Sequence, residues 1–215
     1  MAAATWDLLI STLPHRHERL VALLAEFDRQ WQPGLGALLA RDNFELVHLD
    51  SHTKRQDLLD SSTADYVSYF DDDDWPEPDY VAVIMEALAQ GPDYVGFRVD
   101  VTWAGHPHRK AVHSLECETW NAWADAGPLV RNITHLNPLR RQLARMGTWP
   151  GQTDEQWSEQ VWQTGLVKTE VFIDRELYHY RFDPRDNFSS FRQPMPEPLP
   201  EIPCYPWLTV LPSRS

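Results

Sequence analysis

The segment Asp65-Tyr-Val-Ser-Tyr-Phe-Asp-Asp-Asp-Asp-Trp75 decides how this chain folds, because an apolar run ends in four consecutive aspartates, Asp71 to Asp74. The apolar part has the length and the aromatic content of a buried strand. Four carboxylates at a strand end repel one another, and keeping them there is costly unless a cation offsets the repulsion. A divalent metal with a phosphorylated ligand would provide that cation. The competing interpretation is a solvated acidic turn, as in most charge runs.

The composition describes an ordinary globular protein. The chain has 215 residues, of which 42% are hydrophobic and 24% charged, enough for one domain with a sizeable core. Its net charge of −13 argues against a general basic surface for nucleic acid. Cys117 and Cys204 have no metal-binding spacing and are expected to be free thiols. No signal peptide or membrane-spanning stretch is visible, so we expect a cytoplasmic protein.

The first 90 residues alternate between strand and helix patterns. Strands are predicted over 7–12, 35–40 and 66–70, and helices over 15–30, 53–61 and 78–90. This alternation predicts an α/β layer with a mainly parallel sheet. Polar clusters follow all three strands, so we expect them to converge at the carboxyl edge of the sheet, where such sheets bind ligands.

The second half has a different pattern. An antiparallel pair is predicted from residues 94–103 and 109–115, helices over 137–146 and 154–163, and late strands over 168–173 and 176–182. From residue 183 onward the composition is rich in Pro, Arg, Asn and Ser, which is typical of an extended tail. We therefore predict a single domain, 1–215, with an N-terminal half (1–100), a second half (101–182) and a Pro-rich tail (183–215).

This order of parts resembles a GT-A glycosyltransferase of family 2, and most closely the small members carried by actinobacteria and their phages. The resemblance spans roughly residues 7 to 200. It rests on the segments Leu9-Ile-Ser-Thr-Leu-Pro-His-Arg-His17, Lys54-Arg-Gln-Asp-Leu-Leu59, Asp65 to Trp75, Thr134-His-Leu-Asn-Pro-Leu-Arg-Arg141 and Thr169-Glu-Val-Phe-Ile-Asp-Arg175. It implies a Rossmann-like mixed sheet, with a parallel nucleotide-sugar-binding half and a smaller antiparallel half on the acceptor side. It also implies sugar transfer from a nucleotide sugar, a UDP sugar by preference.

The resemblance implies that the aspartate run holds the DxD motif of the family. The motif falls on Asp71 and Asp73, with Mn²⁺ or Mg²⁺ bridging the donor diphosphate. A run of four leaves a second register open, in which Asp72 and Asp74 take these roles. Asp72 is therefore also a candidate donor-binding residue, and Asp74 could instead cap the helix that follows.

Further donor contacts are implied at the ends of the first two strands and on the helix between the second and third. Thr12, Pro14 and Arg16 lie in the first loop, where relatives contact the nucleotide. Asp42 matches the aspartate that binds a uracil-type base, although a simple turn residue is an equal interpretation. Lys54 lies where a basic residue reaches base or phosphate, and its alternative is a solvated helix lysine.

An inverting transferase needs a general base for the acceptor hydroxyl. Relatives place it at the start of a helix after a glycine-containing loop, which here is Gly151-Gln-Thr-Asp-Glu-Gln-Trp157. Asp154 is the aligned residue and Glu155 its neighbour. A structural alternative exists, because Thr153 and Gln156 form the pattern of a capping box and acidic residues stabilise a helix start.

Some relatives recruit a late histidine as a third metal ligand, and His179 or His135 could do so here, although a lone histidine is more often structural. The acceptor is not specified: a modified phage DNA base, a virion protein and a glycan are all open, with the host cytoplasm as the location for a phage enzyme. Arg140, Arg141 and Arg145 could provide a local basic face.

Two other functions compete with the transferase. A phosphotransferase of the haloacid-dehalogenase type also places aspartates after a strand, but Trp75 and Pro76 follow where its motif needs other residues. A non-catalytic module that binds a sugar or nucleotide on the same fold is the second. The presence of both an acidic cluster and a candidate base favours the enzyme. The oligomeric state is left open.

Overall fold

The first strand, β1 (Trp6–Thr12), lies inside a group of parallel strands in the computed structural model, which describes residues 4–41, 51–121, 126–183 and 201–211. β2 and β3 flank β1 in parallel, and β10 extends the group on the far side of β2. Their bounds are β2 (Leu35–Arg41), β3 (Tyr66–Tyr69) and β10 (Leu208–Val210). The parallel N-terminal half of the predicted fold is confirmed.

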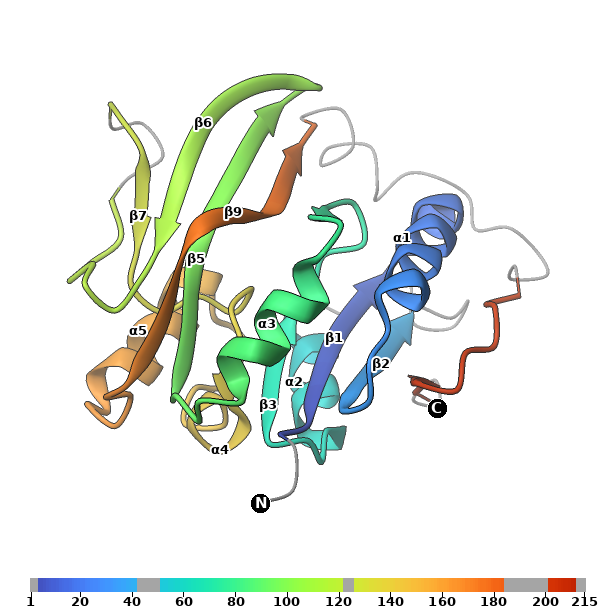
Figure 1. Ribbon diagram of the computed structural model, residues 1–215, viewed down its shortest axis with the longest axis horizontal. Coiled ribbons are helices and arrows are strands. Elements are labelled where there is room, and N and C mark those ends of the chain that lie inside the picture. Colours follow the sequence, from blue (N-terminus) through green and yellow to red (C-terminus); the bar gives the residue numbers. More distant parts are fainter. Residues whose placement is uncertain (1–3, 42–50, 122–125, 184–200, 212–215) are drawn as a thin grey trace.

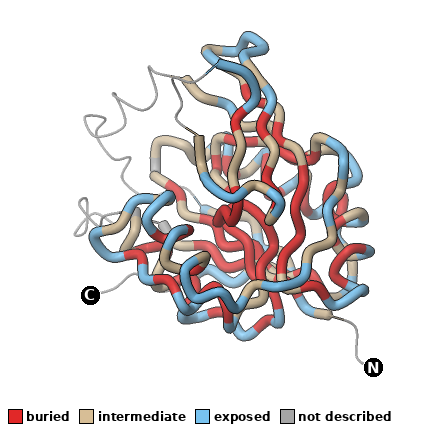
Figure 2. Tube along the Cα trace, turned by 90° about the vertical axis from the view of Figure 1, so that its left-hand side faces the viewer, coloured by how far each residue is buried: buried red, intermediate tan, exposed pale blue. Residues whose placement is uncertain are grey.

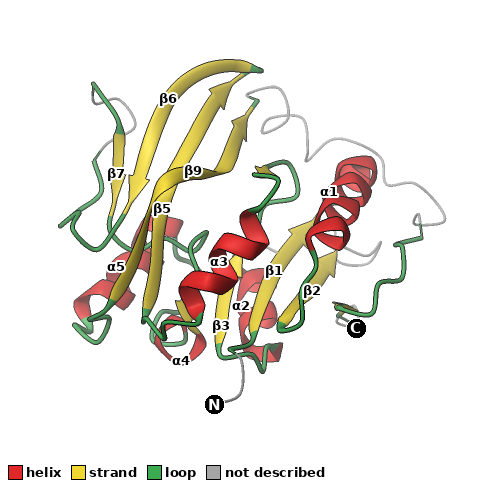
Figure 3. Cartoon of the chain, viewed as in Figure 1, coloured by secondary structure: helices red, strands yellow, loops and turns green. Residues whose placement is uncertain are grey.

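Helices cover both faces of this group (Figures 1 and 3). The helices α1 (His17–Gln30) and α3 (Tyr80–Leu88) pack on one face, with α1 preceded by a 3₁₀ turn over Pro14–Arg16. The opposite face carries α2 (Ser51–Ser61), α4 (Arg141–Ala144) and α5 (Asp154–Gln163). The apolar stripe of α1, predicted from its sequence, is fully buried: Leu20, Leu23, Leu24 and Phe27.

The second half adds the predicted antiparallel pair, β5 (Tyr94–Trp103) and β6 (His106–His113), with β7 (Leu129–Arg131) beyond it. A long last strand, β9 (Glu170–Phe182), runs parallel to β5 and also pairs with the short β4 (Trp75–Pro76). In Figure 2 the buried residues concentrate in the strands, whereas the tip of the β5–β6 hairpin is exposed. Because β9 pairs with β4, it brings the end of the second half beside the aspartate run.

The predicted helix over 137–146 is wrong for its first half. Residues Leu139–Arg140 form a strand, β8, between β3 and β5, and helix α4 begins only at Arg141. The side chain of Asn137 explains the difference, because it donates to the Val95 carbonyl (2.9 Å) and bonds the His113 ring (2.7 Å). These tertiary hydrogen bonds hold the segment against β5 and override its helix-start signal.

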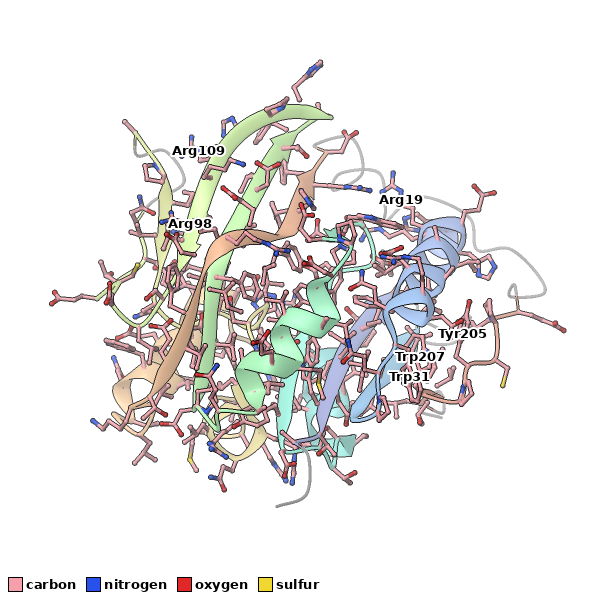
Figure 4. All side chains as sticks on the ribbon, viewed as in Figure 1. Arg19, Trp31, Arg98, Arg109, Tyr205 and Trp207 are labelled. Carbon is pink, nitrogen blue, oxygen red and sulfur yellow. The ribbon has the colours of Figure 1, made fainter. Side chains whose placement is uncertain are left out.

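Two further predictions are corrected. The late strands predicted over 168–173 and 176–182 are one strand, β9, because the residues between them are accommodated as irregularities in its pairing with β5. The tail contains a strand, β10, which sequence composition did not indicate. Trp207, just before β10, anchors this segment: its indole donates to the Asp28 carboxylate (2.9 Å) on α1 and stacks on Tyr205. Figure 4 shows both side chains beside Trp31.

Candidate functional site

The site forms where the carboxyl ends of β1 and β3 meet the end of β9. Asp71 to Asp74 follow β3 directly, Thr12 ends β1, and residues 178–181 of β9 lie alongside because β9 pairs with β4. The parallel pairing of β1 with β3 brings their carboxyl ends together, as the sequence predicted. The end of β9 was not predicted there, and the polar cluster predicted after β2 lies mostly outside the described residues.

Asp72 is fixed by the first loop. Its carboxylate accepts hydrogen bonds from the Thr12 hydroxyl (2.5 Å) and from the Arg16 guanidinium (2.8 Å), and its side chain is only 2% exposed. Arg16 also pairs with Asp73 (3.0 Å). Because both oxygens of Asp72 are engaged inside the protein, it connects the end of β1 to the aspartate run.

Asp74 is fixed by β9. The Tyr178 hydroxyl donates to one of its oxygens (2.6 Å) and the Arg181 backbone N–H to the other (2.7 Å), and the residue is 2% exposed. Burial and the charges of Asp71 and Asp73 raise its pKa well above the ordinary value. Asp74 does not cap the next helix: α3 starts after Asp79 without any side-chain cap.

Asp71 and Asp73 are the two aspartates of the run that keep accessible carboxylates, with side chains 27% and 18% exposed. Burial, followed by repulsion from Asp71 and Asp72, raises the pKa of Asp73 to about 6 despite the opposing charge of Arg16. Asp73 is therefore a carboxylate whose negative charge is incompletely compensated, and additional positive charge would stabilise it.

Asp154 lies at the first position of α5, placed there by the capping box that the sequence predicted. Gln156 N–H donates to the Thr153 hydroxyl (3.2 Å), and Thr153 N–H donates to the Gln156 side-chain oxygen (2.8 Å). The capping role thus belongs to Thr153 and leaves the Asp154 carboxylate available. Its neighbour Glu155 is exposed.

Arg55, on α2, joins Asp154 to the aspartate run. Its guanidinium hydrogen-bonds the Asp154 carboxylate through Nη1 and contacts Asp71 through Nη2 (3.3 Å). Burial would raise the pKa of Asp154, but the charges of His135 and Arg55 lower it below its ordinary value. Burial lowers the pKa of His135, so that ring is neutral near pH 7 and carries little charge. Arg55 is a permanent cation that keeps Asp154 ionised.

An aromatic framework supports this triad of Asp71, Arg55 and Asp154. The Trp149 indole donates to the Tyr69 hydroxyl (2.8 Å) and stacks on Trp157 with ring centroids 4.9 Å apart. Both indoles are fully buried, so they are core residues. Gly147 is required beside them, because a Cβ there would lie 2.7 Å from Trp157 Nε1.

The histidine candidates do not join the aspartates in a three-ligand cluster, and no group of three His, Cys, Asp or Glu suited to a metal occurs among the described residues. The His179 ring bonds Glu77 (2.7 Å) and lies 3.5 Å from Asp100. His135 is buried near Asp154, and neither of its ring nitrogens has a hydrogen-bond partner in the described part of the chain.

The remaining predicted residues are placed as follows. Pro14 begins the 3₁₀ turn after β1, Lys54 is buried on α2, and Asp42 lies outside the described residues. The arginines considered as a basic face are elsewhere: Arg140 pairs with Tyr66, at the start of β3, whereas the aspartates follow its end. Arg140 and Arg145 form ion pairs with Asp93 and Asp60, and Arg141 donates to the Ala64 carbonyl, so these three arginines do not border the site.

Sequence reasoning missed three contributors: Arg55, Tyr178 and Tyr180. Burial and the charges of Asp74, Asp71, Asp73 and Asp154 raise the pKa of the Tyr180 hydroxyl, so it remains a protonated hydrogen-bond donor among these carboxylates. Arg55 stands beside the singled-out Lys54, but nothing in the sequence indicates which of the two faces the site. The tyrosines become visible only once β9 is known to pair with β4.

An open cleft of about 400 Å³ borders the aspartates on the side of α1 and the hairpin tip. Its walls include Asp73, Trp75, Arg19, Arg181 and Thr102. Figure 4 shows Arg19 at the end of α1 nearest this edge of the sheet.

No helix of the described residues is long and apolar enough to cross a membrane.

Comparisons with known proteins identify the fold. No protein-family model matches, and no curated protein is similar in sequence. Solved structures of S. aureus TarS do match. TarS 1–349 in complex with UDP has a TM-score of 0.59 and 11% identity over 86% of this chain, and the complex with UDP-GlcNAc has 0.58 and 9% over 83%. The chain has a GT-A-like fold.

The match covers only part of TarS. This chain spans 63% and 58% of the two 1–349 chains and 38% of another TarS chain, which has a TM-score of 0.57 and 9% identity. At such identities the likeness defines the shared fold, and the chemistry must be argued from the side chains of this protein.

Proposed function

We propose that this protein is a metal-dependent, inverting glycosyltransferase that takes a sugar from a UDP sugar. The observation that carries the proposal is the triad of Asp71, Arg55 and Asp154, which connects an accessible aspartate at the end of β3 to an ionised aspartate at the start of α5. The fold is shared with TarS, a glycosyltransferase whose structures contain UDP and UDP-GlcNAc.

Asp154 serves as the general base. Its lowered pKa means that it is a carboxylate at neutral pH, and 41% of its side chain is exposed, so an acceptor hydroxyl can reach it. As the acceptor oxygen bonds to the anomeric carbon, its proton passes to Asp154 and the bond to the UDP oxygen breaks with its electron pair. Attack on the face opposite the leaving group inverts the anomeric centre.

Mn²⁺ or Mg²⁺ would be held by Asp71 and Asp73, in the first of the two registers. The donor set fits such an ion: Asp72 and Asp74 are buried in internal hydrogen bonds, whereas Asp73 has a raised pKa and gains from positive charge. Two carboxylates with substrate phosphates and water are a usual Mg²⁺ environment. When bound, the ion would neutralise charge on the departing diphosphate.

The other donor contacts belong to the first loop and β9. Thr12 hydrogen-bonds Asp72 and Arg16 pairs with Asp73, so both would lie beside the donor diphosphate. The protonated Tyr180 hydroxyl provides a hydrogen-bond donor among the carboxylates. The acceptor classes remain those suggested by the small actinobacterial and phage enzymes: a modified phage DNA base, a virion protein or a glycan. The proposed location of the enzyme is the cytoplasm.

The test measures UDP release from UDP-GlcNAc and other UDP sugars with Mn²⁺, first with water and then with candidate acceptors. Asp154→Asn should reduce turnover by about 10²–10⁴-fold while UDP binding persists. Glu155→Gln should retain most activity, and Glu159→Gln, an exposed acid on the same helix, is the matched control. Metal-dependent binding without turnover of any donor would instead identify a binding module.

A further inference from the structure

Arg55 occupies a position with a specific geometry between two proposed functional groups. It is a buried cation, with its side chain 11% exposed, and two of its nitrogens point to carboxylates on different elements. Asp71 follows β3 and Asp154 begins α5, so the guanidinium connects the nucleotide-binding half of the chain to the second half. A planar guanidinium suits this task because its donors are rigidly arranged.

The surroundings keep Arg55 in place. The Tyr69 hydroxyl donates to the Arg55 carbonyl (2.9 Å), which fixes the backbone of α2 at this residue. Its guanidinium carbon lies 4.9 Å from the centroid of Trp149 and 5.9 Å from that of Tyr69, which are cation–π distances. Gln56, next on the helix, accepts from Trp149 N–H (3.1 Å). Arg55 is thus a rigid link whose geometry its neighbours define.

Charged and titratable groups from three elements face Asp154. They are His135 from the loop before β8, Arg55 and His52 from α2, and Tyr180 from β9. Neutral His135 contributes little charge, whereas Arg55 is a buried cation that hydrogen-bonds the Asp154 side chain. Arg55 is therefore placed to fix the position of the Asp154 carboxylate and to favour its ionised form.

We propose that Arg55 is the positioning residue of this enzyme: it holds the base at a fixed place relative to Asp71, and hence relative to the anomeric carbon of the donor. This inference rests on the proposed function. It assigns Arg55 to the position of the base and not to donor affinity, because its Nη1 and Nη2 each bond a carboxylate. A misplacement of about 1 Å is enough to cost about 10²-fold in rate.

The experiment compares Arg55→Met and Arg55→Lys with Arg145→Met, a control that removes an exposed arginine paired with Asp60 on α2. Calorimetry with UDP and Mn²⁺ gives affinity, and UDP release from UDP-GlcNAc gives kcat. Arg55→Met should lower kcat about 10²-fold with the UDP Kd within threefold. In the pH profile of kcat, the acidic limb of Arg55→Met should move to higher pH than in the wild type, because an Asp154 without its arginine partner is protonated more easily. Arg55→Lys should recover part of the pH shift but little of kcat.

The double variant Arg55→Met/Asp154→Asn provides the sharpest check. If Arg55 acts through Asp154, its removal adds nothing once the base is gone, so the double variant should match Asp154→Asn in kcat. Multiplicative losses would overturn the proposal. So would a tenfold weaker UDP Kd for Arg55→Met with kcat unchanged, which would make Arg55 a donor contact.

A failure of the proposed function is distinguishable from a failure of this inference. If the wild type neither binds UDP nor releases it from any donor, the transferase assignment fails. Arg55 is then tested alone by ¹³C NMR titration of the Asp154 carboxyl in donor-free protein, assigned with Asp154→Asn. The Asp154 pKa should rise in Arg55→Met and stay unchanged in Arg145→Met; an unchanged pKa in both would overturn the link.

Discussion

Asp73 is expected to be a residue that lowers the stability of the donor-free protein. Its pKa is raised from 3.8 to about 6 by burial and by its acidic neighbours. An acid with a higher pKa in the folded state contributes stability that is present below its unfolded pKa and is lost as the pH rises through the folded value. The window for Asp73 is therefore pH 3.8 to about 6.

The magnitude follows from the size of the shift. A difference of about two pKa units corresponds to about 3 kcal/mol of destabilisation at neutral pH, with the attraction of Arg16 already included. Asp73→Asn removes that cost. It should raise the free energy of unfolding by up to about 3 kcal/mol at pH 7.5, or the Tm by up to about 6–12 °C. At pH 4 the gain should fall below about 1 kcal/mol.

Calorimetric melts of both proteins at the two pH values measure this. Asp174→Asn is the control, since Asp174 pairs with Arg98 at the surface with 70% of its side chain exposed, and it should change stability by at most about 1 kcal/mol at either pH. A gain for Asp73→Asn of equal size at pH 4 and pH 7.5, or no gain at pH 7.5, would refute the reasoning. The variant should also lose any stabilisation by Mn²⁺ with UDP.

Two further changes test the framework around the site. Gly147→Ala places a Cβ about 2.7 Å from Trp157 Nε1. It should cost about 1–3 kcal/mol in urea unfolding and change the near-UV circular dichroism of the Trp149–Trp157 stack, whereas unchanged spectra and stability would contradict the close packing. Tyr178→Phe removes the hydroxyl that donates to buried Asp74. We expect a loss of about 1–3 kcal/mol in the same assay, and a neutral effect would mean that the hydrogen bond is not formed.

Local sequence signals were sufficient for the elements that place the aspartates and the proposed base, Asp154. The apolar run before Asp71 predicted β3, and the Thr153–Gln156 box predicted the first residue of α5, because both depend on near neighbours in the chain. The helix predicted from Asn137 was wrong in its first half, because tertiary hydrogen bonds from Asn137 to Val95 and His113 hold this segment as a strand.

The internal partners of the aspartates were beyond sequence reasoning. Which carboxylates are buried is decided by Tyr178, more than a hundred residues away on β9, and by Arg16 from the first loop. These contacts exist only in the folded sheet, so four identical residues in a row carry no local distinction between them. The structure makes that distinction: Asp72 and Asp74 bind inward, and Asp71 and Asp73 retain accessible carboxylates.

The central claim is that Asp71 and Asp73 form a metal-assisted nucleoside-diphosphate site. Its most direct test is the thermal shift of the wild-type protein with UDP, with Mn²⁺, and with both together. We predict a rise in Tm of several degrees only when both are present, since the ion and the diphosphate stabilise each other on these carboxylates. No shift with both at millimolar concentration, or an equal shift with UDP alone, would contradict it.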